Sequence, residues 1–140
     1  MSNSFSITKS VVTLLLGFAI QKGYIKSLNQ YILDFLPEYK GLPLADQVII
    51  ADLSRMSSGL DWEENYYTPL NPTAKAYYGT NVSQLIFSRR FIDQPGKTFK
   101  YLSANTQILK ILLRRATKKS MTNYVEEKLW NPLEMSQTAL

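Results

Sequence analysis

Three observations predict that this chain is a single, mostly helical domain. Apolar residues recur at helical spacing in residues 6–22, 103–119 and 120–130. Alternating or β-branched runs of the kind that form strands are almost absent. The length of 140 residues is that of one ordinary domain, and an apolar content of 45% is enough for a buried core. We therefore expect one domain over residues 1–140.

The first half of the chain predicts two helices and a mixed segment. Residues 6–22 form the first helix, which is apolar nearly all round and is closed by Gly23. A short helix is expected to begin after Ser27 and to stop at Pro37. The next segment, "VIIADLSRM", begins as a brief β-branched run and continues as a short amphipathic helix.

The second half begins with a long loop and continues as helices. Residues 59–80 are rich in aromatic side chains, and loops of this length inside a domain are usually lids or binding walls. Asn81 is expected to cap a helix over residues 82–90, and "DQPGK" is a turn. The last two periodic segments are helices, of which the second ends at Asn131 and the proline after it.

Composition excludes several kinds of chemistry. The chain contains no cysteine and no histidine, which removes disulfides, Ser-His-Asp catalysis and the usual zinc sites. We expect no metal and no other cofactor, and any general base must be a carboxylate, a lysine or a tyrosine. The net charge is +5, with basic residues gathered in "LRRATKKS". Cations at a helix C-terminus are favourable in themselves, so we expect no nucleic-acid partner.

The apolar run at residues 11–20 has the length of the hydrophobic part of a signal peptide. However, the residues that follow, "QKGYIKS", contain no small-x-small cleavage site. The run is also too short to cross a bilayer. We therefore expect a buried helix, with no membrane span.

The stretch "SITKS" at residues 6–10 places a hydroxyl and an amine three residues apart at the start of the first helix. Residues at this spacing share one face of a helix. A desolvated lysine amine can take the proton of a neighbouring serine hydroxyl, which makes the serine a nucleophile without histidine. Free N–H groups at the helix N-terminus can stabilise an oxyanion. On this motif alone, Ser6 as a plain N-cap remains the simpler interpretation.

The stretch "SITKS" is the first of four blocks of sequence that follow one another in a particular order. After "SITKS" come "DLSRMSSGLDW" at 52–62, "PGKTFKYLSANTQIL" at 95–109 and "EEKLWNPLEM" at 126–135. Together they resemble the superfamily of serine β-lactamases and penicillin-binding proteins, and within it the class C-like branch of esterases and 6-aminohexanoate-dimer hydrolases. The resemblance covers most of the chain. It implies the helical subdomain of an α+β fold that lacks most of its antiparallel sheet.

The resemblance also implies roles for individual residues. Ser6 matches the acyl-accepting nucleophile, and Lys9 matches the residue that activates it. Tyr101 and Ser103 match a Tyr-x-Ser motif that follows a Pro-Gly turn, in which the tyrosine shares protons with the lysine and delivers one to the leaving group. Ser103, together with Asn105, is then expected to bind the lysine or the substrate.

The aromatic loop supplies two further candidate residues. Trp62, in "SSGLDW", and Tyr66 are expected to line the substrate cleft, with packing in the core as an equal alternative for both. The expected substrate is a small molecule with an amide, lactam or ester bond.

The sequence departs from this family in three respects. It has no Lys-x-Gly or His-x-Gly after the tyrosine, and it lacks the segments that build the family's sheet. We therefore expect a piece of a longer chain that is inactive on its own. Lys110, Lys118 and Glu134 stand where relatives tend to carry glycine. If positions 118 and 134 are left-handed, each substitution costs about 1 kcal/mol.

The function that this resemblance implies is hydrolysis by acylation and deacylation through Ser, Lys and Tyr, without a cofactor. Within enzymes, the alternative is a D-alanyl-D-alanine peptidase or transpeptidase. From another class, the alternative is a non-catalytic helical binding module that kept the scaffold and lost the sheet.

Overall fold

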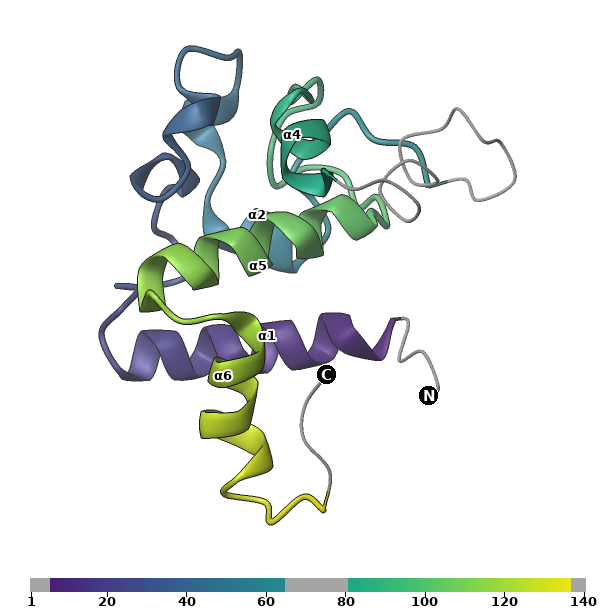
Figure 1. The fold of residues 1–140 in the computed structure, drawn as a ribbon. Coiled ribbons are helices and arrows are strands. Elements are labelled where there is room, and N and C mark those ends of the chain that lie inside the picture. The colour runs from purple at the N-terminus through teal and green to yellow at the C-terminus, as the bar shows by residue number, and fades with distance from the viewer. Residues whose placement is uncertain (1–5, 65–80, 137–140) are drawn as a thin grey trace.

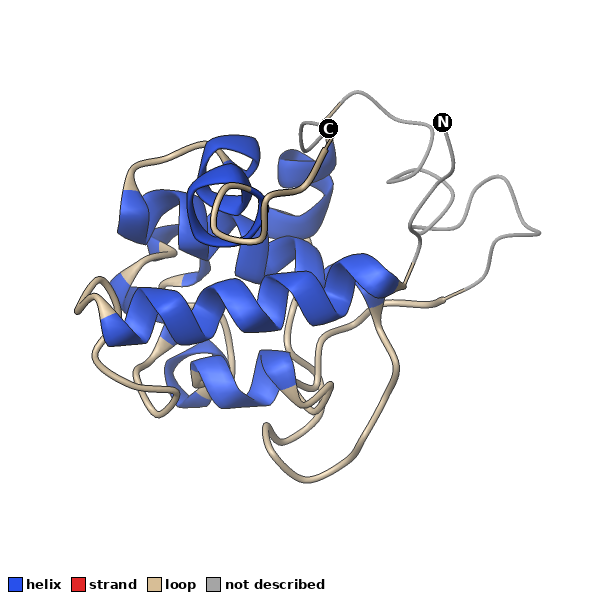
Figure 2. Cartoon of the chain, turned by 90° about the horizontal axis from the view of Figure 1, so that it is seen from below, coloured by secondary structure: helices blue, strands red, loops and turns tan. Residues whose placement is uncertain are grey.

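The computed structural model describes residues 6–64 and 81–136. Within these residues the chain is helical, with no strand and only two isolated β-bridges, Tyr31 to Ile49 and Leu60 to Phe91 (Figure 2). The α-helices are α1 (Ile7–Gln21), α2 (Ile50–Ser54), α4 (Val82–Phe87), α5 (Ser103–Thr117) and α6 (Met121–Val125), which continues as a π-helical turn over Glu126–Trp130. Three short 3-10 turns lie at Ile32–Asp34, Pro37–Tyr39 and Ala45–Gln47.

Helix α5 lies at the centre of the molecule and packs against α1, α2 and α4. Its inward face buries Ala104, Ile108, Leu112 and Leu113, and α1 buries Val12, Leu15, Leu16 and Ala19 against the same core. Full burial of a leucine side chain contributes about 1.5–3 kcal/mol. The two helices run side by side in the same direction, so their N-terminal ends lie at one edge of the molecule (Figure 1).

The ends of these helices follow the local signals in the sequence. Gly23 adopts a φ of +77° after α1, and the amide of Tyr24 donates to the carbonyl of Ala19 at 2.9 Å. The side chain of Asn81 accepts from the amide of Gln84 at 3.0 Å and caps α4. Both the glycine stop and the asparagine cap are confirmed, although α4 ends three residues earlier than expected.

The helix expected between Ser27 and Pro37 is absent, and this prediction was wrong. The amide of Ile32 donates to the carbonyl of Val48 at 3.1 Å, and the amide of Ile50 donates to the carbonyl of Gln30 at 3.0 Å. These bonds pair Tyr31 with Ile49 in an isolated bridge, and the chain continues as a 3-10 turn over Ile32–Asp34, so the paired backbone groups are not available for an α-helix. Tertiary pairing has overridden local helix propensity here.

Basic residues in the last turn of α5 and just after it form ion pairs within the protein. The guanidinium of Arg115 makes a bidentate ion pair with Glu38. It also donates to the carbonyl of Phe35 at 2.9 Å. Lys119 pairs with Glu127. These contacts tie the C-terminal end of α5 to the 3-10 turn at Pro37–Tyr39 and to the last helical segment.

Two of the three residues that stand in place of glycine take left-handed conformations. Lys118 has a φ of +56° at the end of α5, and Glu134 has a φ of +51° after the π-helical turn. A residue with a Cβ is strained in this region of backbone space. Lys110 differs, because it lies inside α5, where its partial burial lowers the pKa of its amine.

In the part of the chain that the structure describes, no helix is both long enough and apolar enough to cross a membrane.

Candidate active site

The N-terminal ends of α1 and α5 bring Ser6 and Tyr101 together. Ser6 directly precedes α1, with a helical φ of −67° and ψ of −17°, and its side chain makes no capping hydrogen bond. Its Oγ lies 2.7 Å from the Tyr101 hydroxyl oxygen. The hydroxyl expected to cap the helix is therefore bonded to a residue 95 positions away.

Lys9 contacts the same tyrosine from the first turn of α1. Its Nζ lies 4.9 Å from the centroid of the Tyr101 ring and donates a hydrogen bond of 3.2 Å to the Ser103 hydroxyl. A cation over an aromatic ring at this distance is an attractive contact. The structure thus places four of the candidate residues, Ser6, Lys9, Tyr101 and Ser103, in one connected cluster.

The electrostatic environment favours the phenolate form of Tyr101. The hydrogen bond with Ser6, and after it the contact with Lys9, lower the pKa of the Tyr101 hydroxyl below its ordinary value of 10.0. The nearby Glu64 carboxylate opposes this shift to a lesser extent. Tyr101 is 43% exposed, so the residue is accessible from solvent.

Glu64 is a member of the cluster that sequence reasoning missed. Its carboxylate accepts the backbone N–H of Ser103 at 2.9 Å and also the Ser103 hydroxyl. The two residues are 39 positions apart, so helical or strand periodicity cannot connect them. The only local signal is a pair of acidic residues, 63 and 64, directly after the aromatic Trp62.

A tight set of backbone bonds positions the segment that carries Tyr101. The amide of Gly96 donates to the carbonyl of Ser57 at 2.8 Å, and the amide of Lys100 donates to the carbonyl of Met56 at 2.7 Å. Gly96 has a φ of +76°, which makes the turn before the tyrosine possible. The "DQPGK" turn is confirmed, and these bonds fix Tyr101 relative to α2.

The remaining candidate residues lie elsewhere. Asn105 is fully buried; its side-chain oxygen accepts from the Ser58 hydroxyl at 2.7 Å, and its amide nitrogen contacts the sulfur of Met56 at 3.7 Å. Trp62 is 2% exposed and belongs to the hydrophobic core, with the Arg89 guanidinium 6.0 Å from its ring. Tyr66 lies outside the described residues, as does most of the loop at 59–80.

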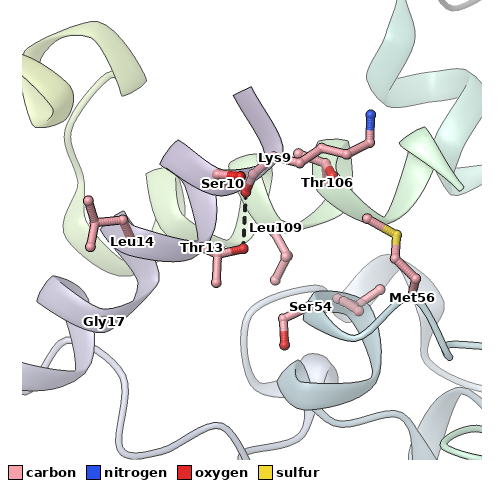
Figure 3. Close-up of a pocket in the computed structure, with 10 residues that line it drawn as sticks. Lys9, Ser10, Thr13, Leu14, Gly17, Ser54, Met56, Thr106 and Leu109 are labelled. Atoms are coloured by element: carbon pink, nitrogen blue, oxygen red, sulfur yellow. Dashed lines mark hydrogen bonds between the residues drawn. The ribbon is translucent and has the colours of Figure 1, made fainter. Parts of the chain in front are cut away.

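A pocket of about 500 Å³ lies beside the cluster, between α1, α2 and α5 (Figure 3). Its lining includes Lys9, Met56 and Thr106 at the end nearest the cluster, and Leu14 and Gly17 further along α1. The Thr13 hydroxyl on this wall donates to the carbonyl of Lys9 at 3.0 Å. The lining is mostly apolar, and Leu14 is half exposed there. Within residues 6–64 and 81–136, no three His, Cys, Asp or Glu side chains gather where they could hold a metal ion.

Comparisons with known proteins are consistent with this arrangement. A family model described as "Beta-lactamase" matches residues 1–140. Among solved structures, a protein assigned as a 6-aminohexanoate-dimer hydrolase from Bacillus anthracis superposes with a TM-score of 0.74 at 18% identity, covering 89% of this chain and 36% of that chain. A D-amino acid amidase from Ochrobactrum anthropi SV3 gives a TM-score of 0.68 at 19% identity, with 94% and 36% coverage.

A class C β-lactamase in complex with cefoxitin also superposes, with a TM-score of 0.68 at 18% identity and with 94% and 34% coverage. At identities this low, the superpositions show similarity of fold alone. The chain spans about one third of the length of these structures. No curated protein sequence matches the chain significantly.

Proposed function

The chain belongs to the β-lactamase family, and on that premise we propose that it carries the nucleophile and the proton-transfer groups of a serine hydrolase. Its fold is consistent with the helical subdomain of β-lactamase-like proteins. Ser6 is the nucleophile, Tyr101 is the proton-transfer group that touches it, and Lys9 supports the charge on Tyr101.

One observation supports this proposal more than any other. The Ser6 Oγ and the Tyr101 hydroxyl oxygen lie 2.7 Å apart, although 95 residues separate them in the chain. Hydrogen-bond contact between a nucleophile and its base is the arrangement that nucleophilic catalysis requires. The Lys9 ammonium beside the ring adds the positive charge that a phenolate needs.

The geometry supports a simple sequence of proton transfers. Tyr101, as the phenolate, accepts the Ser6 proton while Oγ attacks the carbonyl carbon of the substrate. The tetrahedral intermediate collapses when the same proton passes from Tyr101 to the leaving nitrogen or oxygen. This step breaks the amide, lactam or ester bond and leaves the acyl group esterified to Ser6. Water then attacks the ester, with Tyr101 accepting its proton and returning it to Ser6.

The proposed substrates are small molecules that contain an amide, lactam or ester bond. The solved neighbours include a D-amino acid amidase and a class C β-lactamase, whose names refer to amide and lactam bonds. Esters react by the same acyl transfer, and their leaving group is easier to expel. A neutral acyl group suits the mostly apolar pocket beside Lys9.

We also propose that residues 1–140, when isolated, turn over substrate slowly or not at all. The chain spans about one third of the solved neighbours' length. In the family that the sequence resembles, the sheet supplies one of the oxyanion donors. Loss of a single such donor reduces rates by about 10²–10³. The isolated chain should therefore hydrolyse nitrocefin or a nitrophenyl ester only weakly. Turnover that Ser6→Ala abolishes would show instead that residues 1–140 hold a complete site.

Covalent labelling tests the nucleophile directly. A fluorophosphonate probe should modify Ser6, identified by peptide mass spectrometry, in the longest chain that the gene encodes. Ser6→Ala should remove the label. Ser83→Ala is the matched control, because Ser83 is an exposed serine on α4 that does not line the pocket, and this change should leave labelling unchanged. Equal labelling of the Ser6→Ala protein would overturn the assignment.

A further inference from the structure

Glu64 lies at one end of a hydrogen-bond chain that reaches Lys9 through Ser103. Its carboxylate accepts both the backbone N–H and the hydroxyl of Ser103. Ser103 is the first residue of α5, so its N–H is free of helical partners, and a negative charge at this end of a helix is favourable. The Ser103 oxygen in turn accepts from Lys9 Nζ at 3.2 Å.

We propose that Glu64 is a positioning residue of this site, which holds the Ser103 hydroxyl as an acceptor and thereby fixes the Lys9 amine beside Tyr101. The catalytic consequence of this role rests on the proposed function. The positioning of Lys9 by Glu64 and Ser103 does not.

The argument depends on what each group can donate and accept. An ionised carboxylate only accepts hydrogen bonds, whereas a serine hydroxyl donates one and accepts up to two. While the single Ser103 proton points at Glu64, only the lone pairs of its oxygen are available to Lys9. The Lys9 ammonium therefore donates to Ser103, and the Ser103 proton, held by Glu64, does not point at it. Bonds to an ionised partner are also stronger than neutral ones, which makes this orientation stable.

The isosteric substitution Glu64→Gln reverses the direction of the hydrogen bond between the side chains of residue 64 and Ser103. The glutamine oxygen can still accept the Ser103 N–H, so the start of α5 keeps its partner. The glutamine nitrogen, however, now donates toward the Ser103 oxygen. The glutamine nitrogen then takes one of the two lone pairs of the Ser103 oxygen, and the serine proton, which has lost its acceptor, is free to turn toward the Lys9 ammonium, where donor faces donor. The fixed place of the amine beside Tyr101 is lost.

The ionisation of Tyr101 distinguishes this role from a simple effect of charge. The contact with Lys9 lowers the pKa of Tyr101, and the Glu64 carboxylate raises it to a lesser extent. If Glu64 acted only through its charge, Glu64→Gln would lower the pKa of Tyr101 further. If Glu64 holds Lys9 in place, the loss of the stronger lysine contact outweighs that effect, and the pKa rises. The two interpretations predict opposite signs.

The experiment is a pH titration by NMR of protein labelled with ¹³C at the tyrosine Cζ, with the Tyr101 signal assigned from its absence in Tyr101→Phe. We expect the midpoint of Tyr101 to move upward in Glu64→Gln. It should also move upward in Ser103→Ala, which keeps the charge of Glu64 but breaks the chain, and the double variant should show no further rise. Glu63→Gln, the same change at the adjacent residue, is the control and should leave the midpoint in place.

A rate measurement adds the catalytic consequence. Fluorophosphonate labelling of Ser6 should slow in Glu64→Gln by less than the loss of about 100-fold expected for Lys9→Ala, with part of the rate restored by Glu64→Asp, which remains an acceptor. Absence of Ser6 labelling in the wild-type protein, tested in the longest chain that the gene encodes, would refute the proposed function, and the titration would still decide the role of Glu64. A downward shift of the Tyr101 midpoint in Glu64→Gln, or no shift in Ser103→Ala, would overturn the positioning role.

Discussion

A methyl group added at Gly59 should destabilise the protein severely, and the effect can be worked out from the structure. Gly59 has a φ of +73°, and a Cβ built on it would lie 2.0 Å from the backbone oxygen of Asp93. Because backbone atoms cannot turn aside, the two segments must separate. The carbonyl of Gly59 accepts the amides of Ile92 at 2.8 Å and Asp93 at 3.2 Å, and separation weakens both bonds.

The magnitude follows from these two effects. A left-handed conformation costs a residue with a Cβ about 1–2 kcal/mol. Each lost backbone hydrogen bond costs about 1 kcal/mol. Alanine also lowers the conformational entropy of the unfolded chain, which offsets about 0.4–1 kcal/mol of this loss of stability. The net expectation for Gly59→Ala is a loss of about 3 kcal/mol in the free energy of unfolding, a large fraction of the 5–15 kcal/mol that is typical of a domain.

Urea unfolding followed by circular dichroism at 222 nm measures this loss. With a slope of about 2 kcal/mol/M, the midpoint should fall by about 1.5 M. Gly17→Ala is the matched control, because Gly17 lies inside α1 with no atom within 4 Å of an added Cβ. Alanine is the better helix former by about 0.5–1 kcal/mol, so this variant should be more stable than the wild type. A Gly59→Ala midpoint within 0.3 M (about 0.6 kcal/mol) of the wild type would refute the reasoning.

Three further predictions concern the site and the strained helix end. Lys9→Ala and Tyr101→Phe should each slow acylation of Ser6 by at least about 100-fold, and their effects should be non-additive because both act on one proton network; full activity in either single variant would reject the mechanism. The labelling rate of Ser6 should rise with pH as Tyr101 ionises, with a midpoint below 10.0, and Lys9→Ala should move that midpoint upward; a flat profile would contradict a phenolate base. Lys118→Gly should raise the free energy of unfolding by about 0.5–1 kcal/mol, since the φ of +56° suits glycine, and thermal melting checks the sign.

Motif order revealed more about the site than any single residue did. The four blocks of sequence nominated Ser6, Lys9, Tyr101 and Ser103, and the structure brings these side chains together. Asn105 came from the same motif, yet its amide is buried against Ser58. A motif identifies residues that share a segment. It does not say which of them face the substrate, because that depends on how the segment packs.

The sequence by itself determined the two longest helices and several helix ends. Periodic apolar residues predicted α1 and α5, Asn81 predicted the start of α4, and Gly23 predicted the end of α1. These features depend on residues a few positions apart, and such neighbours are already close in the unfolded chain. Local rules of capping, steric strain and amphipathicity are therefore enough to predict them.

The tertiary structure alone decided the pairings that make the site. Ser6 meets Tyr101 across 95 residues, Lys9 meets Ser103 across 94, and Glu64 joins them through a contact across 39. It also replaced the expected helix after Ser27 with a bridge between Tyr31 and Ile49 and a 3-10 turn over Ile32–Asp34. The physical reason is the same in each case. A hydrogen bond between distant segments depends on how α1, α2 and α5 pack around one core, and that packing is a property of the whole chain.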